Sequence, residues 1–105
     1  MTTPAPLTIA EFQALIHRRY FPTDSARGWA GTFAYFIEEV GELATALAAN
    51  NRPQTPPTDE ERANLAEEFA DVLAWMATLA NISGVDIAQA CEKYTDESRV
   101  AGVKE

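Results

Sequence analysis

The chain has 105 residues, a formal net charge of −8 and a hydrophobic content of 47%. This length suits a single domain over residues 1–105, and the hydrophobic content argues against intrinsic disorder. The acidic balance excludes a sequence-independent grip on a nucleic acid polymer, which requires clustered Lys and Arg.

Cysteine content and apolar runs bear on the compartment. Cys91 is the only cysteine, so no intrachain disulfide can form and a reducing compartment is favoured. The longest apolar run, over residues 72–80, is too short to span a membrane. The first seven residues have neither the basic nor the apolar segment of a signal peptide. We therefore expect a soluble, cytoplasmic protein without a membrane partner.

The first predicted helix begins after Thr8. Thr8 and Glu11 have the spacing of a capping box, in which each side chain accepts a hydrogen bond from the other residue's backbone N–H. Pro22 predicts the end of this helix, and an irregular stretch is expected over residues 24–31. One apolar face follows the cap, formed by Phe12, Leu15, Ile16 and Tyr20.

The second predicted helix ends near Asn50, before a Pro-rich loop over residues 51–57. Thr58 and Glu61 form another capping-box spacing and open a third helix, for which Gly84 provides a left-handed stop. The apolar positions of the second helix are Phe33, Phe36, Ile37, Val40, Leu43 and Leu47, and those of the third are Leu65, Phe69, Val72, Leu73, Met76 and Leu79.

A fourth helix is predicted after Asp86, which can cap a run through Ile87, Ala90 and Tyr94. The tail over residues 101–105 is expected to fray. No strand-like alternation occurs, so the sequence predicts an all-α four-helix bundle. Because so short a chain buries only a modest core, completion of the bundle by a second copy is expected.

Four carboxylates interrupt the faces that should be buried. Residues three or four apart share a helix face, so Glu39 and Glu42 adjoin the apolar stripe of the second helix. Glu68 and Asp71 have the same relation to the stripe of the third helix. A single acidic pair is common on a solvated helix face. Two pairs on the apolar sides of adjacent helices favour a metal site, because desolvated like charges resist ionisation unless a cation lies among them.

The donor set indicates the kind of metal. Oxygen-only ligands suit hard ions such as Mg²⁺ or Mn²⁺, whereas softer metals favour Cys or His. Mg²⁺ also takes phosphate oxygens, so an acidic metal cluster can become a phosphate site. The spacing therefore indicates phosphoryl chemistry.

The residues around these acids resemble a known family. Residues 38–43 (EEVGEL) and 67–73 (EEFADVL) resemble the MazG-type all-α nucleoside triphosphate pyrophosphohydrolases. Their signature, Glu-x-x-Glu followed by Glu-x-x-Asp, is matched at 39–42 and 68–71. The similarity runs from about residue 29 to residue 99, which is most of the chain.

The resemblance implies hydrolysis of an NTP or dNTP to its monophosphate and pyrophosphate, with Mg²⁺ or Mn²⁺ as cofactor and house-cleaning of the nucleotide pool as a role. It implies that water attacks the α-phosphorus and that members pair as homodimers or dimers of dimers. Glu39, Glu42, Glu68 and Asp71 are then the metal ligands. Glu38 and Glu39 are the catalytic residues, and Glu38 orients or deprotonates the water or completes a second metal position.

The resemblance also implies which residues contact the substrate. Lys93 matches a lysine that members direct at the phosphates. Arg99 is a further candidate, although this chain has Glu97 and Ser98 where several branches have an Asn-Arg pair. Trp29 is a candidate for stacking on the base, while core packing is the commoner role of an aromatic residue at helical spacing.

Three other functions are compatible with parts of this pattern. A non-enzymatic acidic module that dimerises or binds a protein predicts tolerance of replacements at the acids. A di-iron protein needs Glu-x-x-His pairs, and the single histidine, His17, lies far from the acids in sequence. An activity on another phosphate compound, such as a phosphoribosyl-ATP intermediate, stays open because nothing in the chain distinguishes one base or sugar from another.

Overall fold

The computed structural model describes residues 4–100, 102 and 104. Its first helix, α1 (Ile9–Asn50), begins at the predicted capping box. The Glu11 N–H donates to Thr8 Oγ1 at 3.1 Å, and the Thr8 N–H donates to Glu11 Oε1 at 3.0 Å. These bonds also lower the pKa of Glu11, because they favour its ionised form. The predicted start of the first helix is confirmed.

The predicted end of that helix at Pro22 is wrong, and the irregular stretch expected over residues 24–31 is confined to one residue, Gly28. α1 continues through Pro22, and its only residue with non-helical backbone angles is Gly28, at φ 81° and ψ 172°. Proline removes one helical hydrogen bond and costs about 3 kcal/mol in a helix interior. We attribute the continuation to the next turn, where Asp24 is buried and bonded to α2.

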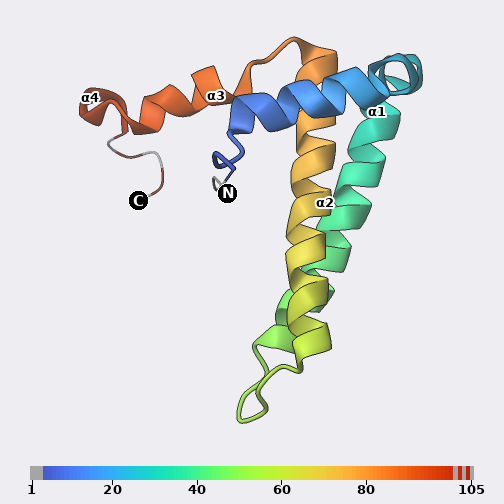
Figure 1. Cartoon of the computed structure of the whole chain (residues 1–105), viewed down its shortest axis with the longest axis vertical. Coiled ribbons are helices and arrows are strands. Elements are labelled where there is room, and N and C mark those ends of the chain that lie inside the picture. Colours follow the sequence, from blue (N-terminus) through green and yellow to red (C-terminus); the bar gives the residue numbers. More distant parts are fainter. Residues whose placement is uncertain (1–3, 101, 103, 105) are drawn as a thin grey trace.

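Gly28 divides α1 into a first arm, residues 9–27, and a second arm, residues 29–50. A positive φ of this kind is readily adopted only by glycine. Figure 1 shows the first arm lying across the upper end of the pair formed by the second arm and α2. The elbow at Gly28 therefore brings the first arm onto α2.

The second long helix, α2 (Asp59–Ser83), also begins at a predicted capping box, between Thr58 and Glu61. It ends at Gly84, whose φ of 70° gives the expected left-handed stop. α2 runs alongside the second arm of α1, and the Pro-rich loop joins them at the far tip (Figure 1). Small buried residues, Ala46 and Ala77, allow the two helices to approach closely.

The predicted fourth helix is broken into short segments: α3 (Ile87–Ala90), a 3₁₀ turn over Cys91–Tyr94, and α4 (Glu97–Val100). Asp86 caps α3 as predicted, by accepting the Gln89 N–H at 3.1 Å. Gln13 on the first arm holds the start of α3, because its Oε1 accepts the Ile87 N–H at 2.9 Å and its Nε2 donates to the Val85 carbonyl at 2.7 Å.

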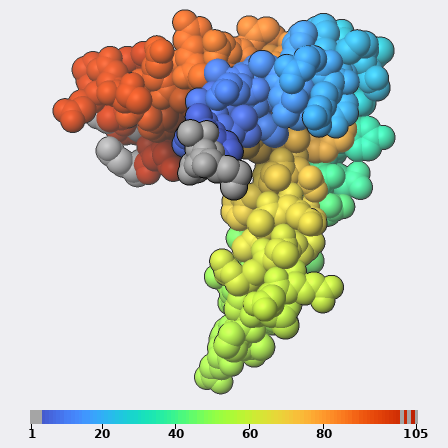
Figure 2. Space-filling view, in the orientation of Figure 1, coloured from blue at the N-terminus to red at the C-terminus, as the bar shows by residue number. Residues whose placement is uncertain are grey.

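The all-α class is confirmed, and residues 4–100 contain no strand. No described helix is long and apolar enough to cross a membrane. In Figure 2 the α1–α2 pair projects from the upper arms, so much of its surface is uncovered within one chain. The apolar side chains exposed on this pair include Phe33, Ile37, Val40, Leu47, Phe69, Leu73 and Met76.

Candidate metal and nucleotide site

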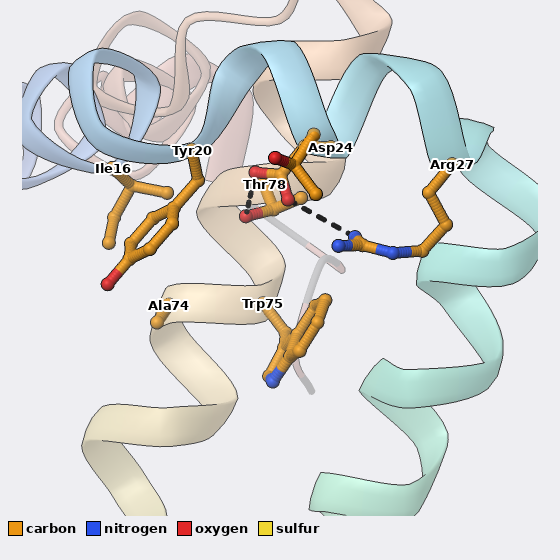
Figure 3. Close-up of a pocket in the computed structure, with 8 residues that line it drawn as sticks. Ile16, Tyr20, Asp24, Arg27, Ala74, Trp75 and Thr78 are labelled. Atoms are coloured by element: carbon orange, nitrogen blue, oxygen red, sulfur yellow. Dashed lines mark hydrogen bonds and ion pairs between the residues drawn. The ribbon is translucent and has the colours of Figure 1, made fainter.

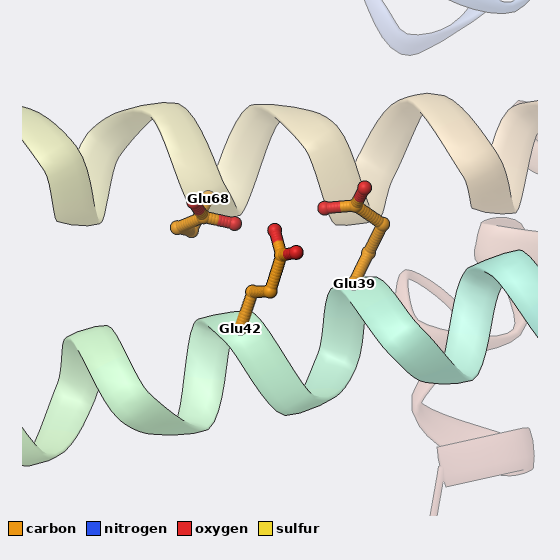
Figure 4. Close-up of side chains that lie close together, drawn as sticks. All are labelled: Glu39, Glu42 and Glu68. Carbon is orange, nitrogen blue, oxygen red and sulfur yellow. The ribbon is translucent and has the colours of Figure 1, made fainter.

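Three of the predicted acids lie together midway along the long pair. Glu39 and Glu42 come from the second arm of α1 and Glu68 comes from α2. Each offers one carboxylate oxygen, and these three oxygens lie within 4.8 Å of one another. Figure 4 shows the three side chains reaching into the space between the two helices. We call them the carboxylate cluster.

The backbone explains this convergence. Glu39 and Glu42 are three residues apart, so they share one face of α1 and lie one above the other. The loop after Asn50 reverses the chain, so α2 runs back along that face. Glu68 then lies opposite the pair from α1 (Figure 4).

Crowding raises the pKa of two members of the carboxylate cluster. For Glu39 the largest cause is burial, followed by the charges of Glu42 and then Asp71. For Glu68 the causes are burial, then the charge of Glu42, then that of Asp71. Both carboxyl groups therefore hold a proton more tightly than an isolated glutamate does. A cation at this position would reverse the effect by favouring ionised carboxylates.

Two oxygens of the carboxylate cluster are buried without a partner. Glu39 Oε2 and Glu68 Oε2 have no hydrogen-bond partner among the described residues. A buried polar atom left unpaired costs about 1–3 kcal/mol, and more when it is charged. Divalent metal ions that favour oxygen ligands fit such a set. The residues present thus fit a hard divalent cation.

Asp71 and Glu38 lie outside the carboxylate cluster. Asp71 is exposed and not among the three converging carboxylates, although its charge raises the pKa of both Glu39 and Glu68. Glu38 is also exposed. Asp71 is one helical turn from Glu68, and its effect on these pKa values places it at the rim of the carboxylate cluster.

The three candidate substrate contacts are not brought to the carboxylate cluster within one chain. Trp29 is 67% exposed, immediately after the elbow at Gly28. Lys93 Nζ lies 5.3 Å from the centre of the Tyr94 ring, and Arg99 is exposed on α4. Figure 1 shows the segment from α3 to α4 extending away from the α1–α2 pair. Their predicted roles stay predictions.

The sequence reasoning missed a second polar cluster at the elbow. Asp24 is only 4% exposed, and it accepts hydrogen bonds from Thr78 Oγ1 at 2.9 Å and from Arg27 Nη1 at 3.1 Å (Figure 3). Arg27 Nη1 also donates to Thr32 Oγ1 at 3.2 Å. We call Asp24, Arg27 and Thr78 the elbow cluster. The i,i+3 spacing of the Asp–Arg pair was the available signal, but it fell in the stretch expected to be irregular.

Comparison with known proteins finds similarity to enzymes that hydrolyse nucleotides. Residues 29–98, more than half of the chain, match the family described as the MazG nucleotide pyrophosphohydrolase domain. The chain is also similar to a dATP/dGTP diphosphohydrolase of Cyanophage S-2L, at 35% identity over 85 residues, which cover 81% of this chain and 68% of the relative. The predicted resemblance is confirmed: the chain belongs to the MazG nucleotide pyrophosphohydrolase family.

Proposed function

We propose that this chain hydrolyses deoxynucleoside triphosphates to the monophosphate and pyrophosphate at the carboxylate cluster, with Mg²⁺ or Mn²⁺ as cofactor. The observation that carries the proposal is the pair of buried, unpartnered oxygens on Glu39 and Glu68. In a chain of the MazG family, these oxygens lie on residues that match the family's acidic signature.

The metal ligands in this proposal are Glu39, Glu42 and Glu68, with Asp71 joining from the rim. A divalent ion bound there supplies positive charge that offsets the charge of the phosphate oxygens. Four carboxylates repel a triphosphate on their own, so the protein's contribution is to hold ligands that attract the substrate only once the ion is present.

The reaction requires a proton acceptor. Oxygen from water forms a bond to the α-phosphorus, the bond from that phosphorus to the bridging oxygen breaks, and pyrophosphate leaves with that oxygen. Glu38 is exposed next to Glu39, so its carboxylate is free to take the proton that the water loses. Glu39 would orient the water from inside the carboxylate cluster.

The substrate class is supported by the relative from Cyanophage S-2L, which is named for activity on dATP and dGTP. We therefore place purine deoxynucleotides first among substrates, in keeping with a role in clearing surplus nucleotides. We also propose that a second copy of the chain covers apolar residues on the α1–α2 pair, such as Phe69 and Leu73, which are 52% and 40% exposed.

The test is release of pyrophosphate from a panel of dNTPs and NTPs with Mg²⁺ or Mn²⁺. Wild type is compared with Glu68→Gln and with Glu60→Gln, an exposed glutamate in the first turn of the same helix. We expect metal-dependent release that falls by roughly 10²-fold in Glu68→Gln and stays unchanged in Glu60→Gln. Failure of wild type to release pyrophosphate from any nucleotide, with metal present, would favour a non-enzymatic binding module.

A further inference from the structure

Two aromatic side chains face each other across the helix pair, one turn away from the acids. Tyr35 comes from the second arm of α1 and Trp75 comes from α2. Their ring centroids lie 5.1 Å apart and their planes are inclined by 15°, so the rings are stacked. We call this pair the aromatic stack. It joins the two helices that carry the carboxylate cluster.

The register of the two helices places the aromatic stack in the layer next to the acids. Because α2 runs back along α1, a step forward on α1 is matched by a step backward on α2. Glu39 follows Tyr35 by four residues on α1. Asp71 precedes Trp75 by four residues on α2. Four residues are about one helical turn, or about 6 Å along the axis, so the two layers are neighbours.

On its other side, the aromatic stack adjoins small side chains and open space. Thr32 precedes Tyr35 by three residues and is buried. Thr78 follows Trp75 by three residues and is buried as well. A cavity of about 400 Å³ opens at the elbow cluster, and Trp75 forms part of its wall. The aromatic stack is thus the bulky contact that keeps α1 and α2 apart next to the acids.

Arg27 restrains the aromatic stack from the elbow. Its guanidinium carbon lies 5.5 Å from the centre of the Tyr35 ring and 5.1 Å from that of Trp75. Figure 3 shows this side chain reaching from α1 towards α2 above Trp75. The same guanidinium donates to Asp24 on the first arm and to Thr32 on the second. A cation fixed in this way attracts both rings and limits their movement.

The separation of the helices matters because the acids come from both of them. Glu39 and Glu42 lie on α1 and Glu68 lies on α2, with one oxygen of each within 4.8 Å of the others. A metal site functions only when its ligands are held within about 0.5 Å of the required geometry. A closer or wider approach of the two helices would move Glu68 relative to both glutamates of α1. A rigid contact one turn away is therefore suited to set the space between the acids.

We propose that Tyr35 and Trp75 are positioning residues for the metal site, because their stack sets the separation of α1 and α2 at the carboxylate cluster. Neither side chain belongs to the carboxylate cluster, so both act through the acids and not on the ion. The inference rests on the proposed function for the presence of a divalent ion among the acids. It concerns the affinity for that ion and not the identity of the nucleotide.

The test measures Mn²⁺ affinity by calorimetry in wild type, Tyr35→Ala, Tyr35→Phe and Tyr94→Ala. Tyr35→Ala removes the ring, whereas Tyr35→Phe retains a ring that can stack. Tyr94→Ala is the matched control, because Tyr94 is 48% exposed, close to the 50% of Tyr35, and lies on the segment that extends away from the α1–α2 pair (Figure 1). We expect affinity to fall about tenfold or more in Tyr35→Ala and to stay within about twofold in the other two variants.

The affinity of the folded protein separates positioning from simple packing. Circular dichroism establishes that each variant is folded before it is titrated. A residue that contributes only packing would lower the Tm and leave the affinity of the folded protein unchanged. If Tyr35→Ala does not fold, Tyr35→Leu keeps an apolar side chain without a flat ring, and we expect the same fall in affinity relative to Tyr35→Phe.

The outcomes separate this inference from the proposed function. Wild-type affinity in Tyr35→Ala or Tyr35→Leu, or an equal loss in Tyr35→Phe or Tyr94→Ala, would overturn the positioning role. The proposed function would then stand if wild type releases pyrophosphate. A loss confined to the variants without the ring, in a protein that hydrolyses no nucleotide, would support the positioning role and count against the proposed function. Absence of Mn²⁺ binding to wild type would overturn both.

Discussion

Asp24 of the elbow cluster and the three acids of the carboxylate cluster all lie between α1 and α2, and their buried oxygens differ in their hydrogen-bond partners. At the elbow cluster, Asp24 is almost fully buried, yet both of its oxygens accept hydrogen bonds, from Arg27 and Thr78. In the carboxylate cluster, Glu39 and Glu68 each have a buried oxygen with no partner among the described residues. A carboxylate with hydrogen-bond partners can hold a structure together, whereas buried carboxylate oxygens without partners favour a site for a cation.

The difference can be tested first at the elbow cluster. Asp24→Asn removes the charge and retains the shape, so Arg27 loses an ionic partner and one of the two hydrogen bonds to residue 24 is weakened. We expect the free energy of unfolding to fall by about 1–3 kcal/mol, measured by urea denaturation. An unchanged value would mean that the elbow cluster contributes nothing to stability.

Replacement of Gly28 at the elbow is expected to have the next largest effect on the free energy of unfolding. Gly28 has φ 81° and ψ 172°, a region that residues with a side chain rarely occupy, and an added Cβ would meet no other atom within 4 Å. Gly28→Ala is therefore expected to cost about 1–3 kcal/mol through the backbone alone. Gly41→Ala, at a helical position that is equally open, is the control and should be neutral or slightly stabilising. Equal effects of the two substitutions would contradict the assigned backbone strain.

The matched substitution in the carboxylate cluster should act in the opposite direction. Glu39→Gln removes one of the repelling charges, so the metal-free protein should gain about 0.5 kcal/mol in free energy of unfolding. The same change should weaken binding of Mn²⁺. Loss of stability in the metal-free Glu39→Gln protein would show that this carboxylate is compensated like Asp24.

The raised pKa values predict the pH dependence of both stability and metal binding. The folded protein holds the Glu39 proton more tightly than the unfolded chain, whose value is near 4.5. The contribution of Glu39 to stability is therefore full below pH 4.5 and is lost as pH rises through the higher folded pKa. Glu68 behaves in the same way.

Protons and metal ions then compete for the same oxygens. The increase in Tm caused by a fixed Mn²⁺ concentration should be large at pH 7.5 and should shrink as pH falls towards 5, in thermal unfolding followed by circular dichroism. An increase in Tm that does not change with pH would place the metal away from Glu39 and Glu68.

Local patterns predicted much of this molecule correctly. Both capping boxes lie where the spacing of Thr8 and Glu11, and of Thr58 and Glu61, placed them. The convergence of Glu39, Glu42 and Glu68 followed from helical periodicity and one chain reversal. Each of these features depends on residues within a few positions of one another, or on two helices that the loop makes antiparallel.

The errors arose where distant contacts decide the structure. Pro22 does not end α1, and the contact that accompanies this continuation joins Asp24 to Thr78, 54 residues further along the chain. The cavity at the elbow cluster combines side chains from the first arm of α1 and from α2. The fourth predicted helix breaks into short segments after Ala90, and Asp96 accepts the Ser98 N–H at 3.0 Å where α4 begins.

The most direct test of the central claim is titration of the protein with Mn²⁺ by calorimetry, in wild type, Glu42→Gln and Glu60→Gln. Glu42 is the member of the carboxylate cluster whose charge raises the pKa of both other members. We expect Mn²⁺ to bind wild type and Glu60→Gln, with affinity at least about tenfold lower in Glu42→Gln. Equal affinity in all three proteins, or no binding to wild type, would contradict the assignment of the carboxylate cluster as a metal site.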